Sequence, residues 1–337
     1  MSVHSVSPDR RSLLATVADL YYVEDRSQQA IADTLGMSRS KVSRLLAEAR
    51  DTGVVEVRIH HQTPVDEELQ AALGDALEGI TCIVVNEEGD QGAAIRAIGD
   101  RAARLLESEL KPGDTLALTH GSTVFEVVRA LRTDQLPGLS VVQMAGFEVR
   151  NPLDNGWQLI RLCVDKLGSR YRYIHTQLLL ASPGLYDAVV DDPDNRDVLD
   201  RARTAEVAVL GIGSVDPTTS SLTRAGHLTQ EQLAAARDQG SIAAINGYHY
   251  DLDGQLLEPL NQRIVGLSPP ELLAIPLRLA VASGPAKAAG VLGAVRAGWI
   301  TALITNPSCA REVTRLATEL GSEHAVTGSA ATRSAAG

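Results

Sequence analysis

From residue 80 onward, short apolar runs alternate with longer amphipathic stretches. The apolar runs, which have the length of buried strands, span 81–85, 115–119, 139–146, 171–180, 207–213, 241–246, 277–284 and 300–305. The amphipathic stretches, which have helical spacing, span about 93–109, 122–132, 156–168, 195–204, 229–238, 285–297 and 307–319. Strands that alternate with helices form a mostly parallel sheet covered on both faces. This part of the chain is therefore predicted to be a Rossmann-like α/β domain.

The N-terminal region shows helical spacing instead, and it predicts a small all-α domain. A first helix is expected over about 9–23, and the stretch 27–50 predicts two short helices joined by a tight turn. Ser27 and Ser38 are expected to cap these two helices, and Gly36 allows the sharp turn between them. This arrangement is typical of a helix-turn-helix, whose second helix enters the DNA major groove.

Short polar and cationic side chains cluster where the second helix of this motif begins. The residues predicted to contact double-stranded operator DNA are Gln28, Ser38, Arg39, Ser40, Lys41, Ser43 and Arg44. The alternative is an ordinary αα-hairpin, which does not require this combination of a Gly-Met-Ser turn, hydroxyls and cations. The pattern favours DNA binding.

The boundaries between these parts follow changes in the pattern. A short strand is expected over 54–60, and Pro64 marks a linker. The helix expected over 66–77 is either a dimerising helix or a helix that packs on the next domain. The predicted divisions are a helix-turn-helix domain (1–61), a linker with a connecting helix (62–79), an effector and oligomerisation domain (80–325) and a disordered tail (326–337).

Composition and charge limit where and how such a protein works. The chain of 337 residues carries a net charge of −11, yet residues 1–61 hold as many basic as acidic side chains. A neutral DNA-binding module binds weakly alone, which predicts a homo-oligomer that presents several copies. No apolar run is long enough to span a membrane, and three widely spaced cysteines suit a reducing cytoplasm. We therefore expect a cytoplasmic protein.

Four strand ends carry residues suited to ligand binding, because ligands of open α/β sheets bind beyond the carboxyl ends of the strands. The segment 119–123 offers His120, Gly121, Ser122 and Thr123, which suit an anion such as phosphate or form a plain capped turn. Lys287, in the segment 283–287 with Gly284, is unfavourable early in a helix unless it meets an anion.

The other two strand ends are less specific. The segment 211–214 resembles a dinucleotide motif without its third glycine, so binding of NAD is only weakly indicated. Asn246, in the segment 244–248, either binds a hydroxylated ligand or is a turn asparagine. The histidines lack metal-ligand spacing, and no nucleophile–base pair is evident, so no metal, cofactor or catalytic residue is predicted.

The motifs taken together resemble those of the SorC-type, sugar-binding transcriptional regulators over about residues 10–320. The segments that carry the resemblance are YYVEDRSQQAIADTLGMSRSKVSRLLAEARDTGVVEVRI, GDTLALTHGSTVFEVVRAL, VAVLGIGS, DLDGQ, RIVGLSPPELLAIP and AVASGPAKAAGVLGAVRAGWITALIT. The resemblance implies an effector domain akin to sugar-phosphate isomerases and deaminases, a tetramer assembled as a dimer of dimers, and a sugar or sugar-phosphate effector.

Carried onto this sequence, the resemblance implies a phosphate loop at Gly121, Ser122 and Thr123 and a ligand contact at Lys287. Two positions depart from the family pattern. Asn246 stands where relatives usually have an acidic residue, and His120 where many have a larger aromatic residue. Both departures bear on the identity of the ligand.

The sequence therefore predicts a transcriptional regulator of carbohydrate metabolism whose operator affinity changes when a sugar or sugar phosphate binds. The rival hypothesis is a sugar-phosphate isomerase or deaminase fused to a DNA-binding head. Such an enzyme needs a general base near the sugar, and His120 is the only candidate in the sequence.

Overall fold

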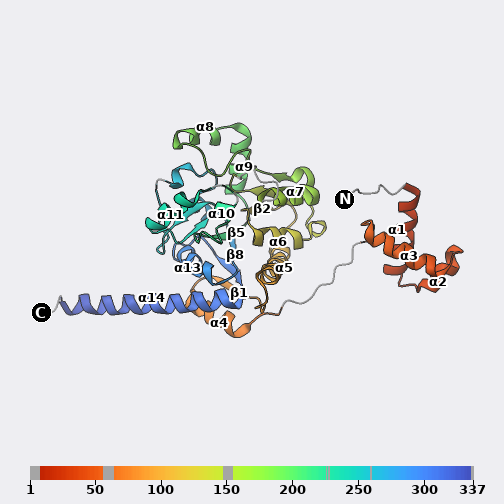
Figure 1. Cartoon of the computed structure of the whole chain (residues 1–337), viewed down its shortest axis with the longest axis horizontal. Coiled ribbons are helices and arrows are strands. Elements are labelled where there is room, and N and C mark those ends of the chain that lie inside the picture. Colours follow the sequence, from red (N-terminus) through yellow and green to blue (C-terminus); the bar gives the residue numbers. More distant parts are fainter. Residues whose placement is uncertain are drawn as a thin grey trace. The chain divides into compact units, whose positions relative to one another are not determined.

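The computed structural model describes residues 8–55, 64–146 and 155–334, apart from 225, 227 and 259. The chain divides into two compact units, Met1–Gln62 and Thr63–Gly337, which we describe separately (Figure 1).

The N-terminal unit consists of α1 (Pro8–Tyr22), α2 (Gln28–Leu35) and α3 (Arg39–Asp51). Their buried faces meet in one core, to which Leu14, Ile31 and Leu45 contribute fully buried side chains. The Ser27 hydroxyl accepts a hydrogen bond from the backbone N–H of Ala30 at the start of α2. These elements confirm the predicted helix-turn-helix. The strand expected over 54–60 lies mostly outside the described residues, and its first positions, 54 and 55, pack against this core without forming a strand.

The second unit is built on a sheet in the order β1-β9-β8-β5-β2-β3-β4, with all of these neighbours parallel. The strands are β1 (Thr81–Val84), β2 (Thr115–Leu118), β3 (Ser140–Gln143), β4 (Tyr171–Arg172), β5 (Val207–Ser214), β6 (Ala243–Ile245), β7 (Tyr248–Tyr250), β8 (Leu277–Val281) and β9 (Ala302–Thr305). This topology confirms the predicted parallel α/β domain.

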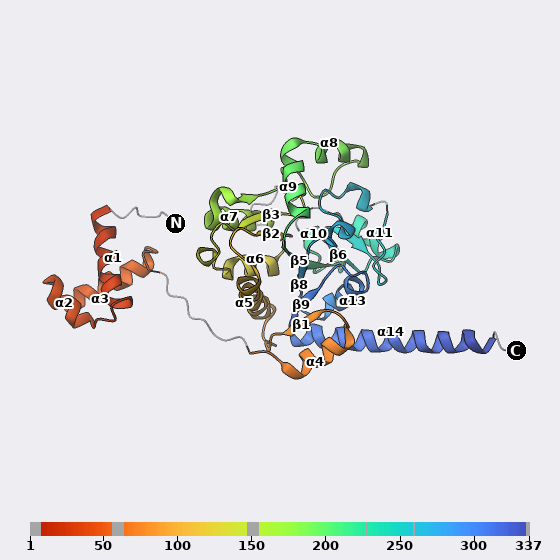
Figure 2. The ribbon, with the colours of Figure 1, turned by 180° about the vertical axis from the view of Figure 1, so that it is seen from behind.

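Helices cover both faces of the sheet. Helices α5 (Gln91–Glu109), α6 (Ser122–Ala130) and α7 (Asn155–Leu167) pack on one face. The opposite face carries α4 (Glu67–Ala76), α9 (Pro193–Arg203), α12 (Pro269–Leu272), α13 (Ala288–Arg296) and α14 (Pro307–Ser334). Figure 2 shows α5, α6 and α7 on one side of the strands and α13 and α14 on the other. The shorter helices α8 (Tyr186–Val190) and α10 (Ser221–Arg224), together with α11 (Gln230–Asp238), lie on the connections between strands.

Two predicted strands of this sheet were wrong in part. The segment 241–246 does not join the parallel sheet, because β6 pairs antiparallel with β5 and with β7. Asn246 and Gly247 form the two-residue turn of this hairpin, both with positive φ (51° and 88°), which Asn-Gly pairs tolerate best. Of the segment 171–180, only β4 joins the sheet. The C-terminal end of this segment turns away from the sheet, and Leu179 forms an isolated β-bridge with Ile264.

At the N-terminal end of the α/β unit the structure selects the second of the two roles left open for the helix over 66–77, packing on the next domain, and the C-terminal end differs from expectation. Helix α4 packs against α14 and β1, with Leu73 fully buried, so it belongs to the α/β unit and not to a free linker. Helix α14 continues to Ser334 and projects beyond the rest of this unit (Figure 1). The disorder predicted from residue 326 is therefore wrong as far as 334; this segment contains no proline, and extending a helix that is already nucleated costs less than starting one.

Candidate functional site

A pocket of about 520 Å³ lies at the carboxyl ends of β1, β9, β8, β5 and β2, which are neighbours in the sheet. The residues predicted to bind an effector all line it: His120, Gly121, Ser122, Thr123, Asn246, Gly284 and Lys287. Segments far apart in the sequence meet here because parallel strands bring their carboxyl ends to one edge of the sheet.

The turn after β2 forms one wall of the pocket. Gly121, with φ of 148°, precedes α6, and no side chain caps this helix. The alternative that the sequence left open, a plain turn in which a side chain caps the helix, is therefore not observed. The first amides of α6 stay available to an anion, with the hydroxyls of Ser122 and Thr123 beside them.

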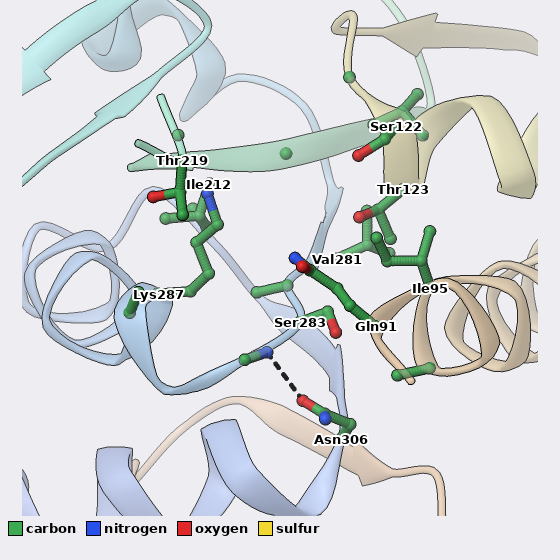
Figure 3. A pocket seen from close by; sticks show the side chains of 18 of the residues that line it. Gln91, Ile95, Ser122, Thr123, Ile212, Thr219, Val281, Ser283, Lys287 and Asn306 are labelled. Carbon is green, nitrogen blue, oxygen red and sulfur yellow. Dashed lines mark hydrogen bonds between the residues drawn. The ribbon is translucent and has the colours of Figure 1, made fainter. Parts of the chain in front are cut away.

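The turn after β8 forms another wall. Gly284, with φ of 89°, leads into the short 3-10 helix η5 (Pro285–Lys287), and its backbone N–H donates to Asn306 Oδ1 at 2.9 Å (Figure 3). This hydrogen bond joins the turn after β8 to the segment that follows β9. In the view of Figure 3, the side chains of Lys287 and Thr219 lie on one side of the pocket, and those of Ser122 and Thr123 on the other.

Lys287 is the half-buried cation of this site. Burial lowers the pKa of its ammonium group to about 8; the nearby Cys309 thiol opposes the shift, and the positive charge of Arg224 adds to it. The side chains of Lys287 and Arg224 form no hydrogen bond or ion pair with any residue that the structure describes. Of these two cations only Lys287 is half-buried, whereas Arg224 is exposed to solvent. A half-buried cation that lacks a counter-charge and lies near a second cation is unfavourable unless an anion completes the site.

Asn246 borders the pocket, but its side chain holds the hairpin turn. Its amide nitrogen donates to the backbone carbonyls of Met144, at 3.1 Å, and Leu267, at 2.7 Å. The amide oxygen is buried and has no partner among the described residues. Both amide hydrogens are thus already used, which agrees with the turn role that the sequence left open.

The glycine-containing segment 211–214 is part of the extended strand β5. A dinucleotide fingerprint requires a tight turn between a strand and a helix. The segment 211–214 therefore does not form the dinucleotide fingerprint that it resembles in sequence. Gly211 instead donates its backbone N–H to Thr119 Oγ1, at 3.0 Å, which ties β5 to the end of β2.

Several pocket residues were not predicted from the sequence: Glu88, Gln91, Thr219, Arg224, Asn306, Ser308 and Arg311. Asn306 directly follows the strand expected over 300–305, and Glu88 closely follows the one expected over 81–85. The strand-end rule applied to these two strands would have found both residues. Thr219 and Arg224 lie on the long β5–α11 connection, where no such rule applies.

Six of the seven predicted DNA-contacting residues lie at the exposed N-terminal end of α3, and the seventh, Gln28, is in α2. Ser38 caps α3 by accepting from the Lys41 backbone N–H at 3.3 Å. The side chains of Arg39, Lys41 and Arg44 are exposed and form no ion pair with any residue in the described part of the chain. Ser40 and Ser43 are exposed beside them, while Gln28, the first residue of α2, is half-buried.

Comparisons with known proteins agree with both units. The family model of a sugar-binding domain matches residues 64–315, and that of sigma-70 region 4 matches residues 15–52. The chain thus combines a helix-turn-helix module with an α/β sugar-binding domain. It belongs to the SorC-type family of sugar-binding transcriptional regulators.

Individual relatives cover nearly the whole chain. The deoxyribonucleoside regulator of Bacillus subtilis is 26% identical over 310 residues, covering 90% of this chain and 97% of the relative. The transcriptional regulator LsrR of Enterobacter sp. is 29% identical over 318 residues, covering 90% and 93%. The full-length sorbitol operon regulator SorC of Klebsiella pneumoniae has the same fold, with a TM-score of 0.65, 22% identity and coverage of 91% and 99%.

Among the described residues, no helix is both long and apolar enough to cross a membrane. No group of three or more potential metal-ligating side chains was found in the same ranges. The three cysteines Cys82, Cys163 and Cys309 are free and buried.

Proposed function

We propose that the pocket binds a sugar phosphate, or another sugar with an anionic group, and that its occupancy changes the affinity of the N-terminal unit for operator DNA. The observation that carries this proposal is the pair of unpartnered cations, Lys287 and Arg224, in a pocket otherwise rich in hydroxyl groups. Its charged lining comprises the cations Arg224, Lys287 and Arg311 and the carboxylate Glu88. This positive balance favours an anionic ligand over a neutral sugar.

The geometry supports a division of roles within the pocket. The uncapped start of α6 with Ser122 and Thr123 can receive a phosphate, because backbone amides and the helix dipole favour negative charge there. Lys287 supplies the compensating charge. The remaining hydroxyl and amide groups, such as Ser283 and Gln91, suit the hydroxyls of a sugar.

On DNA, α3 acts as the recognition helix. Its exposed cations carry the contacts, and the neutral unit gains affinity when several copies bind together. We therefore propose a homo-oligomer, in the form of a tetramer built as a dimer of dimers, that acts on DNA in the cytoplasm. We also propose that the protein is a regulator without catalytic turnover. Its relatives are named as regulators, which supports this.

The test is a matched series of ligands on the full-length protein. Isothermal titration calorimetry compares ribose 5-phosphate, fructose 6-phosphate and glucosamine 6-phosphate with the same three sugars without phosphate. We expect at least one phosphorylated member to bind and to change operator affinity, measured by fluorescence anisotropy. If neither phosphorylated nor free sugars bind, or if binding leaves operator affinity unchanged, the proposed switch is wrong.

The same ligands separate the regulator from the enzyme. Incubation with substoichiometric protein should leave each sugar phosphate unchanged when products are analysed by mass spectrometry and NMR. Isomerisation or release of ammonia that is lost in His120→Ala would instead establish the enzyme hypothesis.

A further inference from the structure

The loop between β1 and α5 touches two functional parts of the α/β unit. The last residue of β1 and the first residues of this loop hold the segment at which the chain enters this unit from the DNA-binding unit. The Asp66 backbone N–H donates to the Val84 carbonyl at 2.8 Å, and the Asn86 N–H donates to the Pro64 carbonyl at 2.7 Å. Val65 bridges Val85 between these two hydrogen bonds. Residues 64–66 are thus fastened to residues 84–86.

The same loop continues directly into the pocket. Glu88, two residues beyond Asn86, lines the pocket and forms an ion pair with Arg311 of α14, which also lines it. Arg311 lies on a tightly packed part of α14, because its neighbours Ala310 and Val313 are fully buried in the core. The ion pair therefore ties the loop to the body of the domain.

This ion pair is weak enough to be opened. The side chains of Arg311 and Glu88 are 55% and 54% exposed, and exposed pairs contribute little because water and salt screen them. An anionic ligand in the pocket would attract the Arg311 guanidinium and repel the Glu88 carboxylate. Both effects weaken the attraction between Arg311 and Glu88, and they act in the same direction.

We propose that the Glu88–Arg311 ion pair is a latch through which the pocket controls the attachment of the linker. An anionic effector opens the latch, the loop after β1 loosens, and the hydrogen bonds that fasten residues 64–66 weaken. The entry point of the linker then gains freedom, which changes how the DNA-binding units of an oligomer can be placed. This inference rests on the proposed function for the identity of the trigger, but the latch itself can be tested without any ligand.

The test measures amide hydrogen exchange in the full-length protein. Its reporters are the N–H groups of Asp66 and Asn86, which donate the two fastening hydrogen bonds. In Glu88→Gln without ligand, we expect both to exchange faster by up to about fivefold, the limit for an exposed ion pair. Glu88→Ala repeats the test without a residual hydrogen bond to Arg311. Unchanged exchange of both amides in both variants would overturn the proposal.

A matched control breaks another exposed ion pair on the same helix. Glu312 pairs with Arg315 of α14, and neither lines the pocket. Glu312→Gln should leave the exchange of Asp66 and Asn86 as in the wild type. If it accelerates them as much as Glu88→Gln does, the effect comes from a general loosening of α14 and the latch is wrong.

Inorganic phosphate serves as the anionic probe, with sodium chloride at equal ionic strength as its control, because salt alone screens the pair. Phosphate should accelerate exchange of both amides in the wild type and leave Glu88→Gln unchanged. An equal response of the two proteins would overturn the latch. If no anion binds while Glu88→Gln still accelerates exchange, the latch stands and the proposed function fails, so the two failures are distinguishable.

Discussion

Effector binding should weaken as the pH rises from 7 to 9, because the charge of Lys287 titrates in this interval. Burial holds the pKa of its ammonium group at about 8 in the free protein. About nine-tenths of the molecules are then charged at pH 7 and about one-tenth at pH 9. If an anionic effector requires the charged form, its Kd increases about tenfold over these two pH units. A phosphate ligand does not confound this, since its second ionisation, with a pKa near 6, is already largely complete.

The assay is calorimetric titration with the effector found in the sugar-phosphate series, at pH 7, 8 and 9 and constant ionic strength. Lys287→Arg is the matched variant that keeps its charge at all three values, because a guanidinium does not titrate in this range. It should bind with little pH dependence. Lys287→Met should bind weakly at every pH. A wild-type Kd that stays constant from pH 7 to 9, or full affinity in Lys287→Met, would refute the role of this lysine.

The same pKa shift predicts an effect on stability without ligand. The pKa is lower in the folded protein than in the unfolded chain, so charging Lys287 costs the folded state free energy below pH 8. This cost disappears as the pH rises from about 8 towards 10.5, the ordinary value for lysine. Lys287→Met should therefore be more stable than the wild type at pH 7, by roughly 1–3 kcal/mol. The difference should shrink at pH 10 in urea denaturation.

Three further predictions concern other parts of the chain. Arg39→Ala, Lys41→Ala and Arg44→Ala should each weaken operator binding, measured by fluorescence anisotropy. The expected loss of binding free energy is about 1–3 kcal/mol where the side chain contacts a base. Unchanged affinity in all three variants would show that α3 is not the recognition helix. Asn246→Ala should destabilise the α/β unit by about 2–3 kcal/mol, because two hydrogen bonds are lost and alanine is strained at positive φ. Asn246→Gly should lose less stability, because glycine adopts positive φ without strain. Leu73→Ala should lower the free energy of unfolding by about 2–5 kcal/mol in urea denaturation. An unchanged free energy of unfolding would show that α4 does not pack on the α/β unit.

The local pattern of the sequence was sufficient for most elements, because each of them depends on neighbouring residues. The spacing of Val42, Leu45 and Leu46 is a property of one helix, and all three are buried as expected. The predicted effector residues reached one pocket for a similar reason. Parallel strands with helical crossovers must end at the same edge, so Thr123 and Lys287 were expected near each other once both were placed after strands.

Two features did not follow from the spacing of a single segment, for different reasons. The spacing of apolar residues over 241–245 does not distinguish parallel from antiparallel pairing, whereas the Asn246-Gly247 turn that follows is typical of a hairpin with the next strand. The choice for α4 between a dimerising helix and a packed one depends on α14, more than 200 residues away. A helical pattern alone does not identify the surface that it covers.

The sequence by itself determined the two-part organisation, the helix-turn-helix, the parallel α/β class and the strand ends that carry the candidate site. These properties follow from local spacing and from rules of connection. Only the tertiary structure decided that Asn246 holds a turn, that Lys287 and Arg224 stand without counter-charges, and that Glu88 meets Arg311. Charge balance, burial and hydrogen-bond satisfaction depend on which groups become neighbours, and that is settled only when distant segments pack together.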